Sequence, residues 1–188
     1  MVFPMNKPSR LTREDWLQAG FTALAESGPN GLKAEPLARR IGTTKGSFYW
    51  HFQDVGQFHV AMMAYWEKRA FTEVVDYLAQ EPFIPKRLRL LGQIAANAAW
   101  PGYEGTPIEP AIRAWSRSEM MVSQVVQRVD AQRLDYLTDM LGEIGLTNPD
   151  FARLVYAGLI GLEDLSSRDG QTPAAPLGTL IDLILSLE

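Results

Sequence analysis

The sequence predicts an all-α protein of about nine helices. Apolar residues recur at helical spacing through most of the chain, and no stretch shows the strict alternation of a half-buried strand. Clusters of Gly and Pro, such as residues 28–31 and 81–85, separate the apolar segments. The 188 residues, 46% hydrophobic and 21% charged, have the composition of a globular protein and suffice for one or two domains.

The first expected element is a helix that ends at about Ser27. Thr12 has the residue type and position of its N-cap, and acidic residues follow in the first turn. Helical spacing places Leu17, Phe21 and Leu24 on the inward face.

Two short helices are expected next, over residues 34–41 and 45–52. Gly42 stands where a left-handed residue ends a helix at low energetic cost, and Thr44 can cap the second helix. Two short helices joined by a turn that contains glycine are the layout of a helix-turn-helix, whose second helix enters the major groove of DNA.

The second short helix has an apolar face and a polar face. Phe48 and Phe52, four residues apart, would anchor it to the core, while donors on the other face meet phosphates or base edges. The alternative is that this helix is an ordinary polar surface helix. In that case Thr44 and Ser47 would serve only as caps, and Arg39 and Arg40 would be solvated. The DNA-contacting residues that we expect are Lys33, Arg39, Arg40, Thr43, Thr44, Lys45, Gly46, Ser47, Tyr49, Trp50 and His51.

A larger helical body is expected after this pair. Apolar stripes and breaks predict helices over residues 54–80, 85–100, 111–117, 118–144, 148–167 and 177–187. The longest irregular connection falls at 101–110.

Several classes of function lack support in the composition. The chain has no cysteine, so it has no thiolate nucleophile and no Cys-based zinc site. His51 and His59 are the only histidines, and no metal-ligand spacing or Gly-rich phosphate loop occurs. We therefore expect no enzyme activity, no metal and no cofactor. No apolar run is long enough to cross a bilayer and no secretion signal is visible, so we expect no membrane partner and a cytoplasmic location.

The charge is unevenly distributed along the chain. Residues 1–53 hold seven basic and four acidic side chains, a net charge of +3, while the net charge of the whole chain is −4. A positive end on an acidic body orients a protein toward phosphate, although chance clustering is the alternative.

Residues 11–58 resemble the DNA-binding domain of TetR-type transcriptional regulators. The resemblance is carried by Leu17-Gln-Ala-Gly-Phe21, Gly28, Leu37-Ala-Arg-Arg-Ile-Gly42 and Lys45-Gly-Ser-Phe-Tyr-Trp-His-Phe52. Ile112-Arg-Ala-Trp115 is similar to a C-terminal domain type of one branch of that family. The sequence departs from the family pattern at Lys33, where a Ser or Thr cap is usual, and near Val55, where a phosphate-binding lysine is common.

The resemblance implies a homodimeric repressor released by a small-molecule effector. Its two helix-turn-helix heads would lie about 34–36 Å apart and read a pseudo-palindromic operator in double-stranded DNA. The implied organisation is an arm over 1–10, a three-helix DNA-binding domain over 11–53, and an effector-binding and dimerisation domain over 54–188. A regulator without an effector, or an activator, is the alternative.

The body offers residues for an effector pocket and for a dimer interface. Aromatic, soft and polar side chains suggest a pocket formed by Tyr65, Trp66, Trp100, Tyr103, Trp115, Met120, Met121, Gln124, Arg128 and Tyr156. Arg113, Asp130 and Arg133 lie in apolar stretches, as a buried ion-pair group or as ligand contacts. The last helix is apolar nearly all round, which favours burial against a second subunit, or else packing within its own domain. The expected interface is Leu154, Gly158, Gly161, Leu162, Leu177, Leu180, Ile181 and Ile184.

Overall fold

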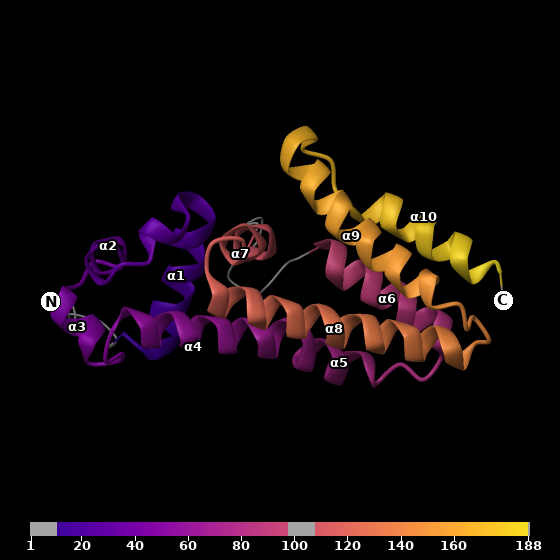
Figure 1. Cartoon of the computed structure of the whole chain (residues 1–188), viewed down its shortest axis with the longest axis horizontal. Coiled ribbons are helices and arrows are strands. Elements are labelled where there is room, and N and C mark those ends of the chain that lie inside the picture. Colours follow the sequence, from indigo (N-terminus) through magenta and orange to yellow (C-terminus); the bar gives the residue numbers. More distant parts are fainter. Residues whose placement is uncertain (1–10, 98–107, 188) are drawn as a thin grey trace, which may run out of the picture. The chain divides into compact units, whose positions relative to one another are not determined.

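The computed structural model describes residues 11–97 and 108–187, and within these ranges it is all α-helical (Figure 1). The chain divides into two compact units, residues 1–62 and 63–188, which we call the N-terminal and the C-terminal unit. No helix in the described ranges is both long and apolar enough to cross a membrane.

The N-terminal unit contains the predicted first helix and the two short helices. They are α1 (Arg13–Ser27), α2 (Ala34–Arg40) and α3 (Lys45–Tyr49), with a 3-10 turn at Pro29–Gly31 after α1. Thr12 and Asp15 form the N-terminal cap of α1, because the Thr12 hydroxyl accepts from the Asp15 amide and the Asp15 carboxylate accepts from the Thr12 amide. Gly42 has a φ of +68°, as expected for the residue that turns the chain between α2 and α3.

Aromatic side chains fill the core of the N-terminal unit. The ring of Phe48 lies 5.3 Å from Trp16, 5.2 Å from Phe52 and 5.3 Å from Phe58. All four side chains are buried, which confirms Phe48 and Phe52 as the predicted anchors of the second short helix.

The helix α4 (Val55–Glu67) contributes residues to both units. The division between the two compact units falls between Met62 and Met63, within α4. The physical reason is packing: Phe58 and Met62 occupy the space beside Gly20, where an added Cβ would lie 2.6 Å from Phe58 Cζ and 2.8 Å from Met62 Sδ.

In the C-terminal unit, α4 continues through a π-helical segment (Lys68–Thr72) into α5 (Glu73–Leu78). The sequence predicts one uninterrupted helix here, and the π-helical segment is the difference. The later helices are α6 (Ile84–Asn97), α7 (Ile108–Ser116), α8 (Met120–Glu143), α9 (Pro149–Asp169) and α10 (Ala174–Leu185). With α4 and α5 taken as one interrupted helix, the described residues form nine helices, as predicted.

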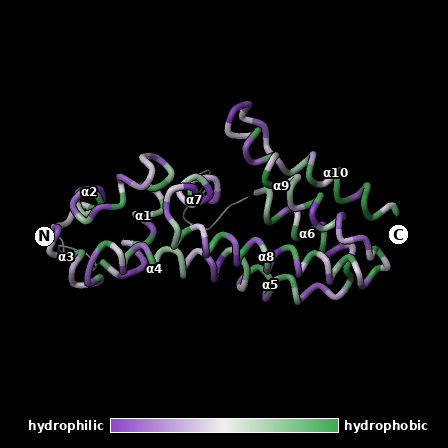
Figure 2. The backbone as a smooth tube through the Cα atoms, in the orientation of Figure 1, coloured by the Kyte–Doolittle hydropathy of each residue, from purple (hydrophilic) through white to green (hydrophobic). Residues whose placement is uncertain are grey.

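The last helix packs within its own unit, against α6 and α9 (Figure 1). The side chain of Ile181 on α10 fills the space beside Gly92 on α6, where an added Cβ would lie 2.4 Å from Ile181 Cδ1. An ion pair between Arg89 and Asp182, 2.7 Å apart, also joins these helices. Apolar residues follow one another along α10 (Figure 2), yet Leu183 and Leu187 remain 61% and 60% exposed. The helix is therefore not covered all round by its own unit.

Candidate functional site

The helix α3 presents a polar and aromatic surface above the buried Phe48. Lys45 and Tyr49 are exposed, and Trp50, directly after α3, is 81% exposed. The Lys45 ammonium group lies 5.9 Å from the centre of the Tyr49 ring. Large aromatic side chains seldom remain exposed without a partner, so this surface is a candidate nucleic-acid interface.

The cations of this surface differ in their pairing. Arg39 pairs with Glu35 at 3.3 Å, and Arg40 pairs with Glu26. Lys33 and Lys45 are exposed, and the described residues provide neither with an ion-pair partner. The positive charges of Lys33 and Lys45 are therefore free to meet phosphates, while those of the two arginines are partly neutralised.

The remaining residues expected at DNA surround α3. Thr44 occupies the N-cap position with an extended backbone, but its hydroxyl makes no capping hydrogen bond, in contrast to the prediction. Gly46 is exposed, whereas Thr43, Ser47 and His51 are partly buried. The structure thus brings all the expected residues into one unit, and the most exposed aromatic side chain among them, Trp50, directly follows α3.

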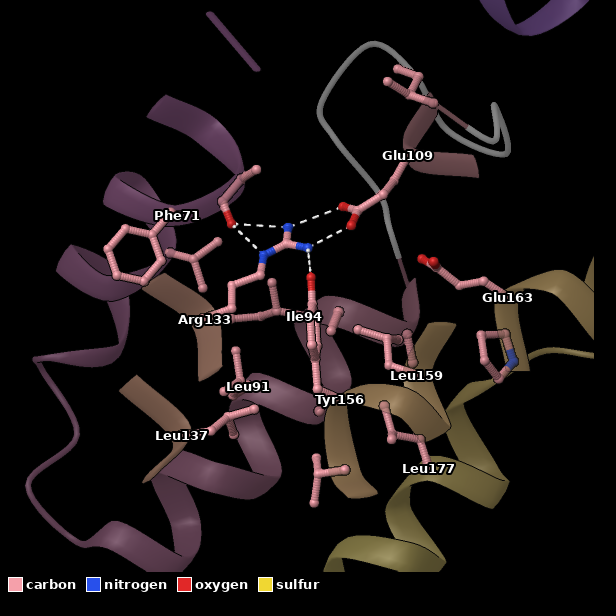
Figure 3. A pocket seen from close by; sticks show the side chains of 18 of the residues that line it. Phe71, Leu91, Ile94, Glu109, Arg133, Leu137, Tyr156, Leu159, Glu163 and Leu177 are labelled. Carbon is pink, nitrogen blue, oxygen red and sulfur yellow. Dashed lines mark hydrogen bonds and ion pairs between the residues drawn. The ribbon is translucent and has the colours of Figure 1, made fainter. Parts of the chain in front are cut away.

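The C-terminal unit contains a partly open cavity of about 1000 Å³. Most of its wall is apolar, and Figure 3 shows Leu91, Ile94, Leu137, Leu159 and Leu177 around it. Elements from α4 to α10 contribute lining residues. An apolar wall with a few polar groups is typical of a small-molecule site.

Arg133, on α8, lies in the middle of the polar groups at one end of this cavity (Figure 3). Its guanidinium group contacts both carboxylate oxygens of Glu109, with Nη2 3.0 Å from Oε2. It also donates to the Ala70 carbonyl from Nη2 at 3.0 Å and to the Tyr156 hydroxyl from Nη1 at 3.3 Å. The Ala70 carbonyl belongs to the π-helical segment, so Arg133 ties that segment to α7 and α9.

A second arginine extends the same network. Arg113 Nη2 lies 2.9 Å from Glu109 Oε1, 2.8 Å from Asp130 Oδ1 and 2.7 Å from the Tyr156 hydroxyl. The Tyr156 hydroxyl donates to Asp130 Oδ1 at 2.6 Å. Arg113, Asp130 and Arg133, singled out from the sequence, therefore meet in one cluster through Glu109 and Tyr156.

The ionisation of this cluster follows from burial and pairing. Burial alone would raise the pKa of Glu109, but the charges of Arg133 and Arg113 and their hydrogen bonds lower it to about 2. Burial raises the pKa of Tyr156 to about 12, although both arginines act in the opposite direction. Glu109 is therefore ionised and Tyr156 is neutral at physiological pH.

Glu163, on α9, is a further acid in the cavity wall. Burial, followed by the negative charge of Glu109, raises its pKa to about 7, against smaller opposing effects of Arg113 and Arg133. No residue in the described ranges gives its carboxylate a hydrogen bond or an ion pair.

The expected pocket residues are only partly gathered at this cavity. Trp66 and Tyr156 line it, and Trp100 and Tyr103 lie outside the described residues. The others are not in its wall; Arg128, for instance, pairs with Glu67 at 3.0 Å, and Met120 is 76% exposed. The expected residues that lie away from the cavity are Tyr65, Trp115, Met120, Met121, Gln124 and Arg128.

Glu109 and Glu163 are two of the many cavity residues that sequence reasoning missed. The i,i+4 spacing of Glu109 and Arg113 was an available signal for a pair on one helix. For Glu163 the sequence offered no such signal, because the burial of this side chain depends on how α9 packs against distant segments. No group of three or more acidic or His residues with metal-binding geometry occurs among the described residues.

The expected dimer residues fall into two groups. Leu177, Ile181 and Ile184 are buried within their own unit, and Leu180 fills the space beside Gly158, 2.8 Å from an added Cβ. Leu154 and Gly161 are exposed and Leu162 is half-buried. Leu165 and Leu183, not in the expected set, are 52% and 61% exposed. The surface open to a partner thus lies on the outer faces of α9 and α10.

Comparison with known proteins finds a family model that matches the segment of the first site. Residues 17–54 match the family model described as bacterial regulatory proteins, tetR family, which confirms the resemblance seen in the motifs. That family consists of transcription regulators and not of enzymes. No curated protein sequence matches the chain significantly.

Solved structures share the fold over nearly the whole chain. A Rhodococcus sp. protein described as a TetR-family transcriptional regulator is 20% identical, with a TM-score of 0.70 over 93% of this chain and 96% of that one. The fatty acid degradation regulator FadR from Bacillus halodurans is 12% identical, with a TM-score of 0.69 over 96% and 97%. SmeT, the repressor of the Stenotrophomonas maltophilia multidrug efflux pump SmeDEF, is 18% identical, with a TM-score of 0.66 over 96% and 92%.

Proposed function

We propose that this chain is a sequence-specific DNA-binding repressor that works in the cytoplasm and leaves its operator when a small molecule enters the cavity of the C-terminal unit. The observation that carries the DNA-binding part is the exposed surface formed by Lys45 and Tyr49 on α3 and by Trp50 directly after it, within the segment that matches the family model. Lysine and tyrosine donors position a helix on phosphates, and Trp50 offers apolar contact with a thymine methyl group.

The proposed regulator acts as a homodimer through α9 and α10. Leu154, Gly161, Leu162 and Leu165 recur on α9 at helical spacing, and Leu180 and Leu183 do so on α10, with Leu187 two residues after its end. Two outward apolar stripes on helices that pack against each other suit a symmetric interface in which each subunit uses the same surface. Two identical subunits would present two copies of α3 to a pseudo-palindromic operator.

The proposed effector acts on α4, which links the two sites through the chain itself. Phe58 and Met62 of α4 are buried in the N-terminal unit, while Trp66, one turn later, lines the cavity. The π-helical segment that follows is held by Arg133 through the Ala70 carbonyl. A ligand that prefers one arrangement of this segment would bias α4, and hence the DNA-binding unit, by its difference in affinity for the two arrangements.

Selection of DNA from a random pool with the purified chain tests the proposal. We expect a pseudo-palindrome whose half-sites lie about one helical turn apart, bound with an affinity that falls steeply with salt. A reporter gene placed behind the selected sequence then shows whether the chain lowers transcription. Binding without sequence preference, or an affinity independent of salt, would contradict a sequence-specific regulator.

A further inference from the structure

The arginines at the polar end of the cavity have their positive charges balanced within the protein. Arg133, which reaches the cavity wall, already contacts Glu109, Tyr156 and the Ala70 carbonyl. Arg113 is paired with Asp130 and Glu109. Each acid of the network faces an arginine, so an anionic ligand would have to break an existing buried ion pair to gain a cationic partner.

Glu163 differs from every other charged residue of this network. Its side chain comes from α9 and points toward the space beside Glu109 and Tyr156 (Figure 3). It has no hydrogen bond or ion pair among the residues that the structure describes. A partly buried carboxylate without a partner is costly, and that cost is removed when a cation reaches it.

The groups around Glu163 define what could pair with it. Glu109 on α7, Arg113 on α7 and Arg133 on α8 are the charged groups that act on its carboxylate. Two more charged residues line the cavity, Arg69 and Glu73, and they pair with each other at 3.7 Å. The contributions of α6 and α10 to the wall are Leu88, Leu91, Leu177 and similar apolar or neutral residues.

We propose that the cavity takes an apolar ligand that carries one protonated amine, and that the amine pairs with Glu163. The volume and the apolar wall accept a hydrocarbon or aromatic body, and Glu163, the one lining carboxylate that no described residue pairs with, selects the charge of the head group. An anionic ligand meets the negative charge of Glu163 with no free arginine, and a neutral ligand leaves the carboxylate unpaired. This ligand class rests on the proposed effector role of the cavity.

The same pairing makes binding depend on pH. Glu163, with a pKa of about 7 in the empty cavity, is largely protonated at pH 5.5 and largely ionised at pH 8. An alkylamine, with a pKa of about 10, stays protonated over this range. The affinity for an amine therefore rises from pH 5.5 to pH 8, and binding near pH 7 releases a proton from Glu163.

Three ligands of the same chain length test the inference on the full-length protein: decylamine, decanol and decanoate, each below its aggregation concentration. Titration calorimetry at pH 8 gives the three dissociation constants, and the change in tryptophan fluorescence, to which Trp66 in the cavity wall contributes, is a second readout. We expect decylamine to bind at least about tenfold more tightly than decanol, and decanoate to bind most weakly.

The variant Glu163→Gln keeps the shape of the side chain and removes its charge. It should weaken decylamine binding by roughly 10- to 100-fold, change decanol binding less than about twofold, and abolish the rise of decylamine affinity between pH 5.5 and pH 8. Asp164→Asn is the matched control, because Asp164 is the next residue on α9, is exposed and pairs with Arg168 outside the cavity wall. It should bind all three ligands as the natural chain does.

The outcomes separate this inference from the proposed function. Equal affinities for decylamine and decanol, no binding of any of the three, or an unchanged decylamine affinity in Glu163→Gln would each overturn it. Tight decylamine binding that leaves the affinity for operator DNA unaltered would support the ligand class and contradict the effector role of the cavity.

Discussion

The Glu163 carboxylate binds a proton more tightly in the folded chain than in the unfolded chain. Its folded pKa is about 7 against an ordinary value of 4.5, so ionisation of the buried carboxylate lowers stability as pH rises between these values. Glu163→Gln removes the ionisable group. We expect it to raise the free energy of unfolding by up to roughly 3 kcal/mol at pH 8 but by only about 1 kcal/mol at pH 5. Urea denaturation at both pH values measures the difference, and equal gains at the two would contradict burial as the cause.

Glu109 shows the opposite dependence. Its pKa of about 2 lies below the ordinary 4.5, so its stabilising contribution is complete above about pH 4.5 and is lost as pH falls toward 2. Glu109→Gln leaves Arg113 and Arg133 with the single charge of Asp130. We expect a loss of about 3–5 kcal/mol at pH 7, the cost of an uncompensated buried cation.

Denaturation of Glu109→Gln measures this loss. Glu81→Gln is the control variant, since Glu81 pairs with Lys86 outside the cavity wall. A change below about 1 kcal/mol in Glu109→Gln would argue against the buried network as a source of stability.

The sequence predicted part of this network and not the rest. Arg113, Asp130 and Arg133 were identifiable because charged residues inside apolar helical stretches need partners. The partner of Arg133 proved to be Glu109, from a segment 24 residues earlier. Glu163 lies on α9 among residues of ordinary helical spacing, so only the packing of α7, α8 and α9 reveals that it is partly buried and that no described residue pairs with it.

Among the elements, α3 carries the proposed DNA contact, and Lys45 is its exposed cation. Lys45→Ala should weaken operator binding and lower the slope of log affinity against log salt by about 1 for each head, hence about 2 for a dimer. The physical reason is that each lost phosphate contact leaves one fewer counterion to release. Gel-shift titrations at several salt concentrations give the slope.

Lys68→Ala is the control for this measurement, because Lys68 is an exposed lysine of the C-terminal unit that pairs with Glu73. An unchanged slope in Lys45→Ala would remove Lys45 from the phosphate contacts, whatever the change in affinity.

Helix positions were predictable where local chemistry determines them. The N-cap at Thr12, the turn at Gly42 and the aromatic anchors Phe48 and Phe52 are all visible as residue types at fixed spacing. The π-helical segment Lys68–Thr72 was not, since the Ala70 carbonyl is bonded by Arg133, a residue 63 positions away. Nor could the sequence assign the two faces of α10, because a mostly apolar helix looks alike whether its own unit or a partner covers it.

For the whole molecule, assembly depends on apolar side chains that the folded chain leaves uncovered. Leu154, Leu165 and Leu183 are 55%, 52% and 61% exposed on α9 and α10. In a symmetric dimer each substitution occurs twice in one interface, so Leu154→Glu would bury two like charges without partners. We expect the dissociation constant of the dimer to rise by roughly two orders of magnitude or more, with the fold of each subunit retained because Leu154 is outside the core.

Sedimentation velocity over a range of concentrations measures this change, and Arg153→Glu is the matched control, one residue earlier on α9 and off the apolar stripe. Because one head alone makes only half of the phosphate contacts, the Leu154→Glu monomer should also lose most of its affinity for a two-half-site operator while still binding a single half-site weakly. A natural chain that sediments as a monomer, or a Leu154→Glu variant that remains dimeric, would rule out this surface. A monomeric variant with full operator affinity would show instead that the two heads do not act together.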